Sequence, residues 1–331
     1  MDYQKTFFDF LKANIPKDTT LPDYIEDKLH VSRDGAYRRI GGRTALTLNE
    51  AMALLQSQGL NMGDFTGTTP GKMIFDQIST GIDGSHSVFS SYLDFLSKIS
   101  PLELTYLANS IPRNHLFGFP DLTFFQMFFT AKTMFGDPNF QHINFATGLP
   151  QKAAFLELLE PVSEFLNQIP STEILWFDAV DSLLNPMLYY RETHQFDDEE
   201  TIFYLLDQLT EFIGHLEKMA AAGRKIEYGK NRDSLGAPFQ LYFTEVPLHE
   251  TTAIFRLDQG PIVLHVMNGL NMISTANTHY CQRVQSLAQS IMEKSSNLVS
   301  GGEKLRIQFF NAQYRKIETT RKQIKLMRIR G

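Results

Sequence analysis

The chain has 331 residues, of which 43% are hydrophobic and 21% are charged, and this composition excludes a disordered protein. Its length predicts two or three folded units. The net charge of −6 excludes a protein coated with positive charge, although it leaves room for a local DNA-binding face.

The first sixty residues predict a series of short helices. Phenylalanines near helical spacing indicate a helix over Asp2–Asn14. Thr20 and Ser32 are good N-caps for a second helix and for a third that ends near Ile40. The sequence Thr47–Glu50 is a capping box that opens a fourth helix. We therefore expect a four-to-five-helix bundle over residues 1–62.

The next stretch is rich in glycine, threonine and proline and has few apolar residues. This composition is typical of a connecting segment, so we expect a linker over residues 63–73. The remaining residues, 74–331, then form a second and larger unit.

This second unit is predicted to be mainly helical. A capping box at Ser100–Glu103 indicates a helix start. Further helices are expected at 121–134, 150–168, 172–191, 198–222, 274–296 and 303–328. Short β-rich runs at 239–246, 251–257 and 261–267 indicate strands, the last two joined as a hairpin at Asp258–Gly260. The predicted fold class is thus mainly α, with a small antiparallel sheet near 239–267.

The second and third helices fit a helix-turn-helix, which needs a supporting helix, a tight turn and an exposed recognition helix. The inner faces would be formed by Ile25, Leu29, Val31, Ala36 and Ile40. The recognition helix, Ser32–Ile40, would then lie in the major groove of duplex DNA.

Positive charge is concentrated on this predicted recognition helix. Between Arg33 and Arg43 there are four arginines and one acid, whereas residues 1–62 as a whole carry eight bases and eight acids. Arginine can form paired hydrogen bonds with guanine, and contacts to phosphate add affinity without reading sequence. We expect base contacts from Arg33, Tyr37 and Arg38, and backbone contacts from Arg39 and Arg43. The full predicted interface is Ser32, Arg33, Asp34, Tyr37, Arg38, Arg39 and Arg43.

The segment resembles the lambda-repressor-like (Cro/repressor) helix-turn-helix domains. The matching residues are Ile25, Leu29, Val31–Ser32, Ala36 and the apolar helix Leu48–Leu55. Three positions depart from the family pattern. Glu26 replaces a small alanine, His30 replaces the turn glycine, and Arg39 stands where an apolar residue is common. These departures affect the angle between the two helices.

Longer strings resemble a family of helix-turn-helix regulators from Bacteroidetes-type bacteria. They are SRDGAYRRIGGRTALTLNEA, IPRNHLFGFPDLTFFQMFF and SSNLVSGGEKLRIQFF. The resemblance covers most of the chain and implies a transcription regulator. It implies no particular effector.

The partners follow from this interpretation. We expect double-stranded DNA and a homodimer, because paired half-sites match the pseudo-symmetry of DNA. A small-molecule effector of undefined class would bind the second unit, where 239–267 could line a pocket. The last helix has nine bases and two acids over 303–331. It is either a solvated face, a second contact with DNA phosphates, or a contact with the acidic remainder of a partner subunit.

Other function classes are less well supported. No nucleophile–base pair, metal cluster or phosphate loop is readable, so we expect no enzyme, cofactor or metal site. The single cysteine, Cys281, fits a reducing compartment, and the chain has neither a signal-peptide pattern nor eighteen consecutive apolar residues. We therefore expect a cytoplasmic protein without a membrane span. The main alternative is a protein-interaction scaffold with a helix-turn-helix-like head that does not bind DNA.

Overall fold

The protein is described by a computed structural model that covers residues 2–16, 18–58, 60, 62–66, 73–79, 85–142, 145, 149–196, 198–228, 235–267, 269 and 271–330. The chain divides into two compact units, Met1–Phe75 and Asp76–Gly331, each with its own hydrophobic core. In the predicted linker 63–73, residues 67–72 lie outside the described ones. Among the described helices, none combines the length and the apolar composition that crossing a bilayer requires.

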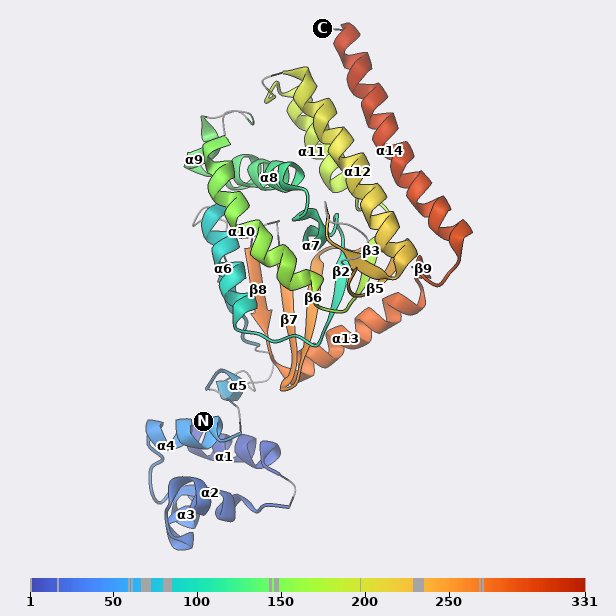
Figure 1. Ribbon diagram of the computed structural model, residues 1–331. Coiled ribbons are helices and arrows are strands. Elements are labelled where there is room, and N and C mark those ends of the chain that lie inside the picture. Colours follow the sequence, from blue (N-terminus) through green and yellow to red (C-terminus); the bar gives the residue numbers. More distant parts are fainter. Residues whose placement is uncertain are drawn as a thin grey trace. The chain divides into compact units, whose positions relative to one another are not determined.

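The N-terminal unit, here called the head, is a helical bundle (Figure 1). Its helices are α1 (Tyr3–Asn14), α2 (Leu21–Leu29), α3 (Arg33–Ile40), α4 (Leu48–Gln56) and α5 (Met62–Thr66). The predicted caps are confirmed. Thr20 accepts a hydrogen bond from the amide of Asp23, Ser32 accepts one from Gly35, and Thr47 and Glu50 form the capping box.

In the second unit, here called the body, the described residues form a nine-stranded mixed sheet, so the prediction of a mainly α fold with a small antiparallel sheet near 239–267 is wrong. The strands are β1 (Asp76–Ser79), β2 (Glu103–Ala108), β3 (Ser171–Trp176), β4 (Arg224–Ile226), β5 (Leu235–Thr244), β6 (Thr251–Leu257), β7 (Gly260–Met267), β8 (Asn271–Thr275) and β9 (Ser296–Asn297). Their order is β1-β8-β7-β6-β2-β3-β5-β4, and β9 pairs with β5. The pairs β2–β3 and β3–β5 are parallel.

Two of the errors come from buried central strands. The capping box expected at Ser100–Glu103 precedes strand β2 and not a helix, and the helix expected over 172–191 is strand β3 followed by a helix from Asp181. Strand β2 alternates polar and apolar residues only over Glu103–Tyr106 and ends in three buried residues, and β3 has its polar residues first and its apolar residues last. Neither strand therefore shows the sustained alternation that identifies a half-exposed strand. The hairpin predicted at Asp258–Gly260 is confirmed, since Leu257 pairs with Gly260.

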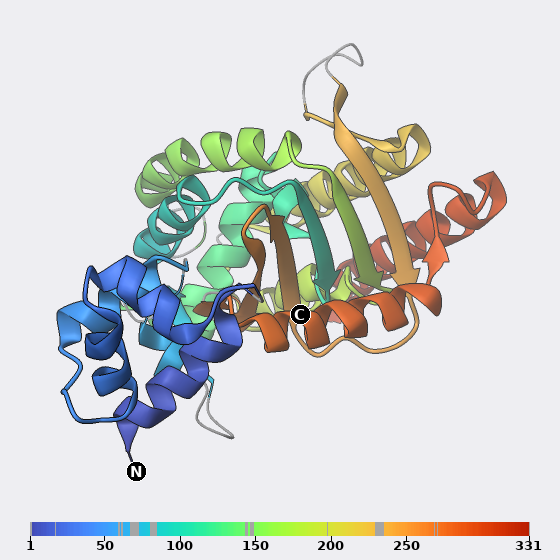
Figure 2. The ribbon, with the colours of Figure 1, turned by 90° about the horizontal axis from the view of Figure 1, so that it is seen from below.

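The body helices cover the two faces of the sheet unequally. They are α6 (Ser85–Ser97), α7 (Arg113–Leu116), α8 (Pro120–Phe129), the π-helix η2 (Thr130–Phe135), α9 (Pro138–Gln141), α10 (Leu149–Asn167), α11 (Asp181–Glu192), α12 (Glu199–Ala222), α13 (Thr278–Glu293) and α14 (Glu303–Arg330). Helix α13 packs on one face, against Leu107, Ile174 and Val263. Helices α6, α10 and α12 lie on the opposite side of the sheet (Figure 2).

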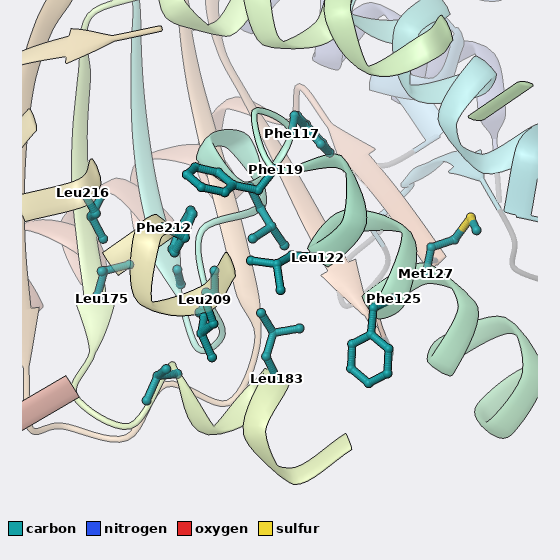
Figure 3. Close-up of a cluster of buried hydrophobic side chains, with 14 of the residues drawn as sticks. Phe117, Phe119, Leu122, Phe125, Met127, Leu175, Leu183, Leu209, Phe212 and Leu216 are labelled. Carbon is teal, nitrogen blue, oxygen red and sulfur yellow. The ribbon is translucent and has the colours of Figure 1, made fainter. Parts of the chain in front are cut away.

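This opposite face holds the main core of the body. Phe119 and Leu122 from the segment around α8 meet Leu209 and Phe212 of α12, with Leu183 of α11 beside them (Figure 3). All five side chains are fully buried. Full burial of side chains of this size contributes about 1.5–3 kcal/mol each, so this cluster fixes the helices that surround the carboxyl end of the parallel strands.

Candidate nucleic-acid interface

Helices α2 and α3 are joined by a tight turn. Helix α2 ends at Leu29 and is capped by His30, which has the left-handed conformation (φ 52°, ψ 40°), and α3 begins after the Ser32 cap. Ile25 of α2 and Ala36 of α3 are completely buried between the helices. The turn therefore has the connection expected of a helix-turn-helix, with a histidine in the conformation that glycine adopts most easily.

The outer face of α3 carries the predicted base-contacting residues. The side chains of Arg33 and Arg38 are 59% and 53% exposed, and Tyr37 is 55% exposed. Arg33 forms an ion pair of 3.0 Å with Asp23, and Arg38 forms one of 2.8 Å with Asp34, one turn earlier in α3. The hydrogen bond with Tyr37 and the charge of Asp23 raise the pKa of Arg33. These exposed pairs are screened by water and salt, so each arginine can exchange its carboxylate for a phosphate or a base edge.

Arg39 points into the head and not toward solvent. Its guanidinium donates to the Glu50 carboxylate at 2.6 and 3.1 Å and to the carbonyl of Gly35 at 3.2 Å. The side chain is only 17% exposed. The hydrogen bond from Arg39 lowers the pKa of Glu50, which keeps the pair ionised. The prediction that Arg39 contacts the DNA backbone is therefore at odds with this geometry. Arg39 instead ties α3 to α4.

The end of α3 is fixed by a residue that the sequence analysis missed. Gln4 of α1 donates to the carbonyls of Arg39 and Thr44, at 2.7 and 2.8 Å, and accepts from the amide of Leu46 at 3.0 Å. These bonds hold the loop that carries Arg43, whose side chain is exposed. The link joins residues about forty positions apart, so no local sequence signal could have identified it.

A groove lies beside this end of α3. It has a volume of about 850 Å³. Its lining comes from α1, the segment that follows it, the start of α2, and Tyr37, Ile40, Gly41 and Gly42 at the end of α3. Lys5 and Lys12 contribute positive charge, and Asp2 and Asp9 contribute negative charge. The groove borders the exposed face of α3 at Tyr37.

The body contains a buried polar cluster that the sequence analysis also missed. Glu173 of β3 is 2.9 Å from Nε2 of His115, and the hydroxyl of Ser171 donates to the same carboxylate oxygen. Lys225 of β4 donates to the carbonyls of Leu166 and Ile169. Burial alone would raise the pKa of Glu173, but the charges of His115 and Lys225 lower it. The cluster joins α7, β3 and β4 inside the core and is closed to solvent.

The basic last helix is partly neutralised within the body. Lys316 pairs with Asp178 and, at 3.1 Å, with Asp181. Arg321 pairs with Asp207 at 2.6 Å. These contacts attach α14 to α11 and α12, which weakens the case for a second DNA contact along this helix.

Among the residues that the structure describes, no three histidine, cysteine, aspartate or glutamate side chains converge to hold a metal ion. No protein-family model, curated protein or solved structure matches the chain. The resemblance to lambda-repressor-like domains therefore stays a prediction.

Proposed function

We propose that the head binds duplex DNA, with α3 in the major groove, and that the protein is a sequence-specific transcription regulator. The observation that carries this proposal is the division of α3 into two faces. Arg33, Tyr37 and Arg38 are exposed together, while Ala36 and Arg39 are held inside by α2 and α4. A recognition helix needs this combination of a fixed inner face and a free basic outer face.

The roles of the interface residues follow from their surroundings. Arg33, Tyr37 and Arg38 would contact base edges, and the exposed Ser32 and Arg43 would contact phosphates. Asp34 neutralises Arg38 in the absence of DNA and would be displaced when that arginine binds a base. Arg39 would act as a positioning residue through Glu50.

The test uses the full chain and a duplex selected from a random pool. Replacing Arg33 and Arg38 with alanine is expected to reduce affinity for the selected duplex by about 30-fold or more, because each lost base contact is worth at least about 1 kcal/mol. The measurement is fluorescence anisotropy across a salt series, in which wild-type affinity should fall steeply as counterions are released.

A matched control removes the same charge elsewhere. Arg224 and Arg283 are exposed arginines of the body, and their double alanine variant should bind the selected duplex as the wild type does. If the Arg33 and Arg38 variant keeps its affinity, or if both double variants lose affinity equally, α3 is not the recognition helix.

The proposal includes a cytoplasmic homodimer. Two heads bound to half-sites about 34 Å apart would match the repeat of B-DNA. The selected sequences should then be inverted repeats, and light scattering should give twice the mass of the chain. A single half-site bound by a monomer would exclude this part of the proposal.

One observation favours a second candidate, a protein-interaction scaffold. The groove of about 850 Å³ beside α3 mixes charged and apolar lining residues, as a peptide-binding surface does. This candidate predicts that no duplex is enriched from the random pool. It also predicts that substitutions in α1, such as Lys12→Glu, change the binding of a co-purifying protein.

A further inference from the structure

The body has a recess next to β2, the strand on either side of which the later strands are added. From β2 the chain adds β3 and β5 on one side, and it later adds β6, β7 and β8 on the other. In open α/β sheets, ligands commonly bind in crevices outside the carboxyl ends of parallel strands, and β2 is parallel to its neighbour β3. Asn109 and Ser110, which directly follow the carboxyl end of β2, line a cavity of about 460 Å³.

The walls of this cavity come from several elements that hydrogen bonds hold in place. The hydroxyl of Thr251, at the start of β6, donates to the side-chain oxygen of Asn109 at 2.8 Å. The side-chain nitrogen of Asn109 donates to the carbonyl of His249 at 3.0 Å. Ser182 in the first turn of α11 accepts from the amide of Ile111 at 3.2 Å. The cavity is therefore preformed, since its rim is tied to β2, β6 and α11 independently of any ligand.

A π-helical segment contributes another wall. Helix α8 continues into η2 at Thr130, and the lining residues Gln126, Phe129, Thr130 and Met134 span this junction. Short π-helical segments are rare, and they occur frequently at functional sites because the extra residue redirects side chains. Across this junction, an amide, a hydroxyl and two apolar side chains line the same surface.

The chemistry of the lining restricts the ligand. Six lining residues have neutral hydrogen-bonding side chains: Asn109, Ser110, Gln126, Thr130, Ser182 and Thr251. Among the described lining residues there is no lysine or arginine, and Glu250 is the only carboxylate. A phosphate or carboxylate would find no lysine or arginine there to offset its desolvation, and His249 is the one lining side chain among those described that could pair with it.

We propose that this cavity, here called the β2 cavity, binds a neutral, hydroxyl-rich molecule the size of a monosaccharide or disaccharide. Its hydroxyl groups would exchange hydrogen bonds with Ser110 and Gln126, while an apolar face of its ring would pack on Phe129 and Met134. The size of the cavity lies within the range of small-molecule sites. This site would make the body a sensing unit, independently of whether the head binds DNA.

The experiment measures ligand binding by the full chain with isothermal titration calorimetry and thermal shift. The probes are glucose, galactose, ribose, myo-inositol and sucrose, with glucose 6-phosphate and glucosamine as charged counterparts of glucose. Each probe is added at about 10 mM, which would nearly saturate a site with a dissociation constant of about 1 mM. At least one neutral probe should then bind with a stoichiometry of one per chain. If glucose is that probe, its charged counterparts should bind more weakly; another bound sugar is compared with its own phosphate and amine.

Matched variants locate the site. Gln126→Leu should weaken binding about tenfold, because it removes a hydrogen-bonding group at nearly constant size. Gln285→Leu changes a half-buried glutamine of α13 on the opposite face of the sheet and should bind as the wild type does. Ser110→Ala serves as a second cavity variant if Gln126→Leu lowers the melting temperature.

Three results would overturn the proposal. The first is that no neutral probe binds. The second is that a charged counterpart binds as tightly as its neutral parent, and the third is that the cavity variants bind like Gln285→Leu. Since none of these measurements includes DNA, they leave the test of the recognition helix separate.

Discussion

Lys225 shows how a single charged residue holds the body together. Its side chain is 1% exposed, and its ammonium group donates to two carbonyls at the end of α10, at 2.7 and 2.8 Å. Burial lowers the pKa of Lys225 to about 8, and the charge of Glu173 opposes this shift. The residue therefore remains mainly protonated near neutral pH, and it supplies both the hydrogen bonds of a helix end and the countercharge of a buried carboxylate.

Replacing Lys225 with methionine is expected to destabilise the body by about 3–5 kcal/mol, because it leaves two buried carbonyls and the Glu173 carboxylate without this partner. Urea unfolding followed by Trp176 fluorescence measures the change, since Trp176 is the only tryptophan and lies in β3. The double variant Lys225→Met with Glu173→Gln should recover about 1–3 kcal/mol relative to the sum of the single changes. Simple additivity would show that the two charges are not coupled.

At the scale of elements, the turn between α2 and α3 contains a residue with a strained backbone. His30 has a φ of 52°, a conformation that disfavours side chains and that glycine adopts freely. His30→Gly is therefore expected to stabilise the head by about 1 kcal/mol. Hydrogen exchange of the amides in α2 and α3 measures this, and their exchange should slow by about fivefold.

His194 offers the matched control, because it has a φ of 54° just after α11 in the body. His194→Gly should stabilise the body and leave exchange in α2 and α3 unchanged. Faster exchange in the head after His30→Gly would mean that the histidine side chain makes contacts worth more than the backbone strain.

The same elements show what sequence could and could not predict. The caps at Thr20, Ser32 and Thr47 act within three residues of themselves, so local patterns located the head helices correctly. Strand β2 could not be recognised, because its partners β3 and β6 lie about 70 and 150 residues further along the chain. A segment of six residues such as β2 is compatible with a helix or a buried strand until its partners are known.

The candidate interface could also be predicted only in part. The exposure of Arg33 and Arg38 follows from helical spacing. The inward turn of Arg39 does not, because it depends on Glu50 in the next helix and on Gln4 in the first. The β2 cavity could not be predicted from the sequence, because its lining comes from segments as far apart in the chain as Asn109 and Val266.

For the whole molecule, the separate cores of head and body predict separate responses to acid. Burial lowers the pKa of His215 in α12 to about 4, against an ordinary value of 6.5, and burial also lowers the pKa of His265 in β7. As the pH falls below 6.5, these histidines bind protons in the unfolded body but stay neutral in the folded body, so acid destabilises the body. In the head, Glu50 has a lowered pKa, and its contribution to stability is lost only below pH 4.5.

Between pH 7 and pH 5 the body should therefore lose about 2 kcal/mol through His215 alone, while Glu50 continues to stabilise the head. Trp176 fluorescence in urea reports the body, and hydrogen exchange in α2 and α3 reports the head. His215→Gln keeps a donor for the carbonyl of Ile226, which His215 contacts at 2.9 Å, and removes the titration, so its body should lose less stability at pH 5. If both units instead weaken together in wild type and variant alike, the two cores do not unfold independently.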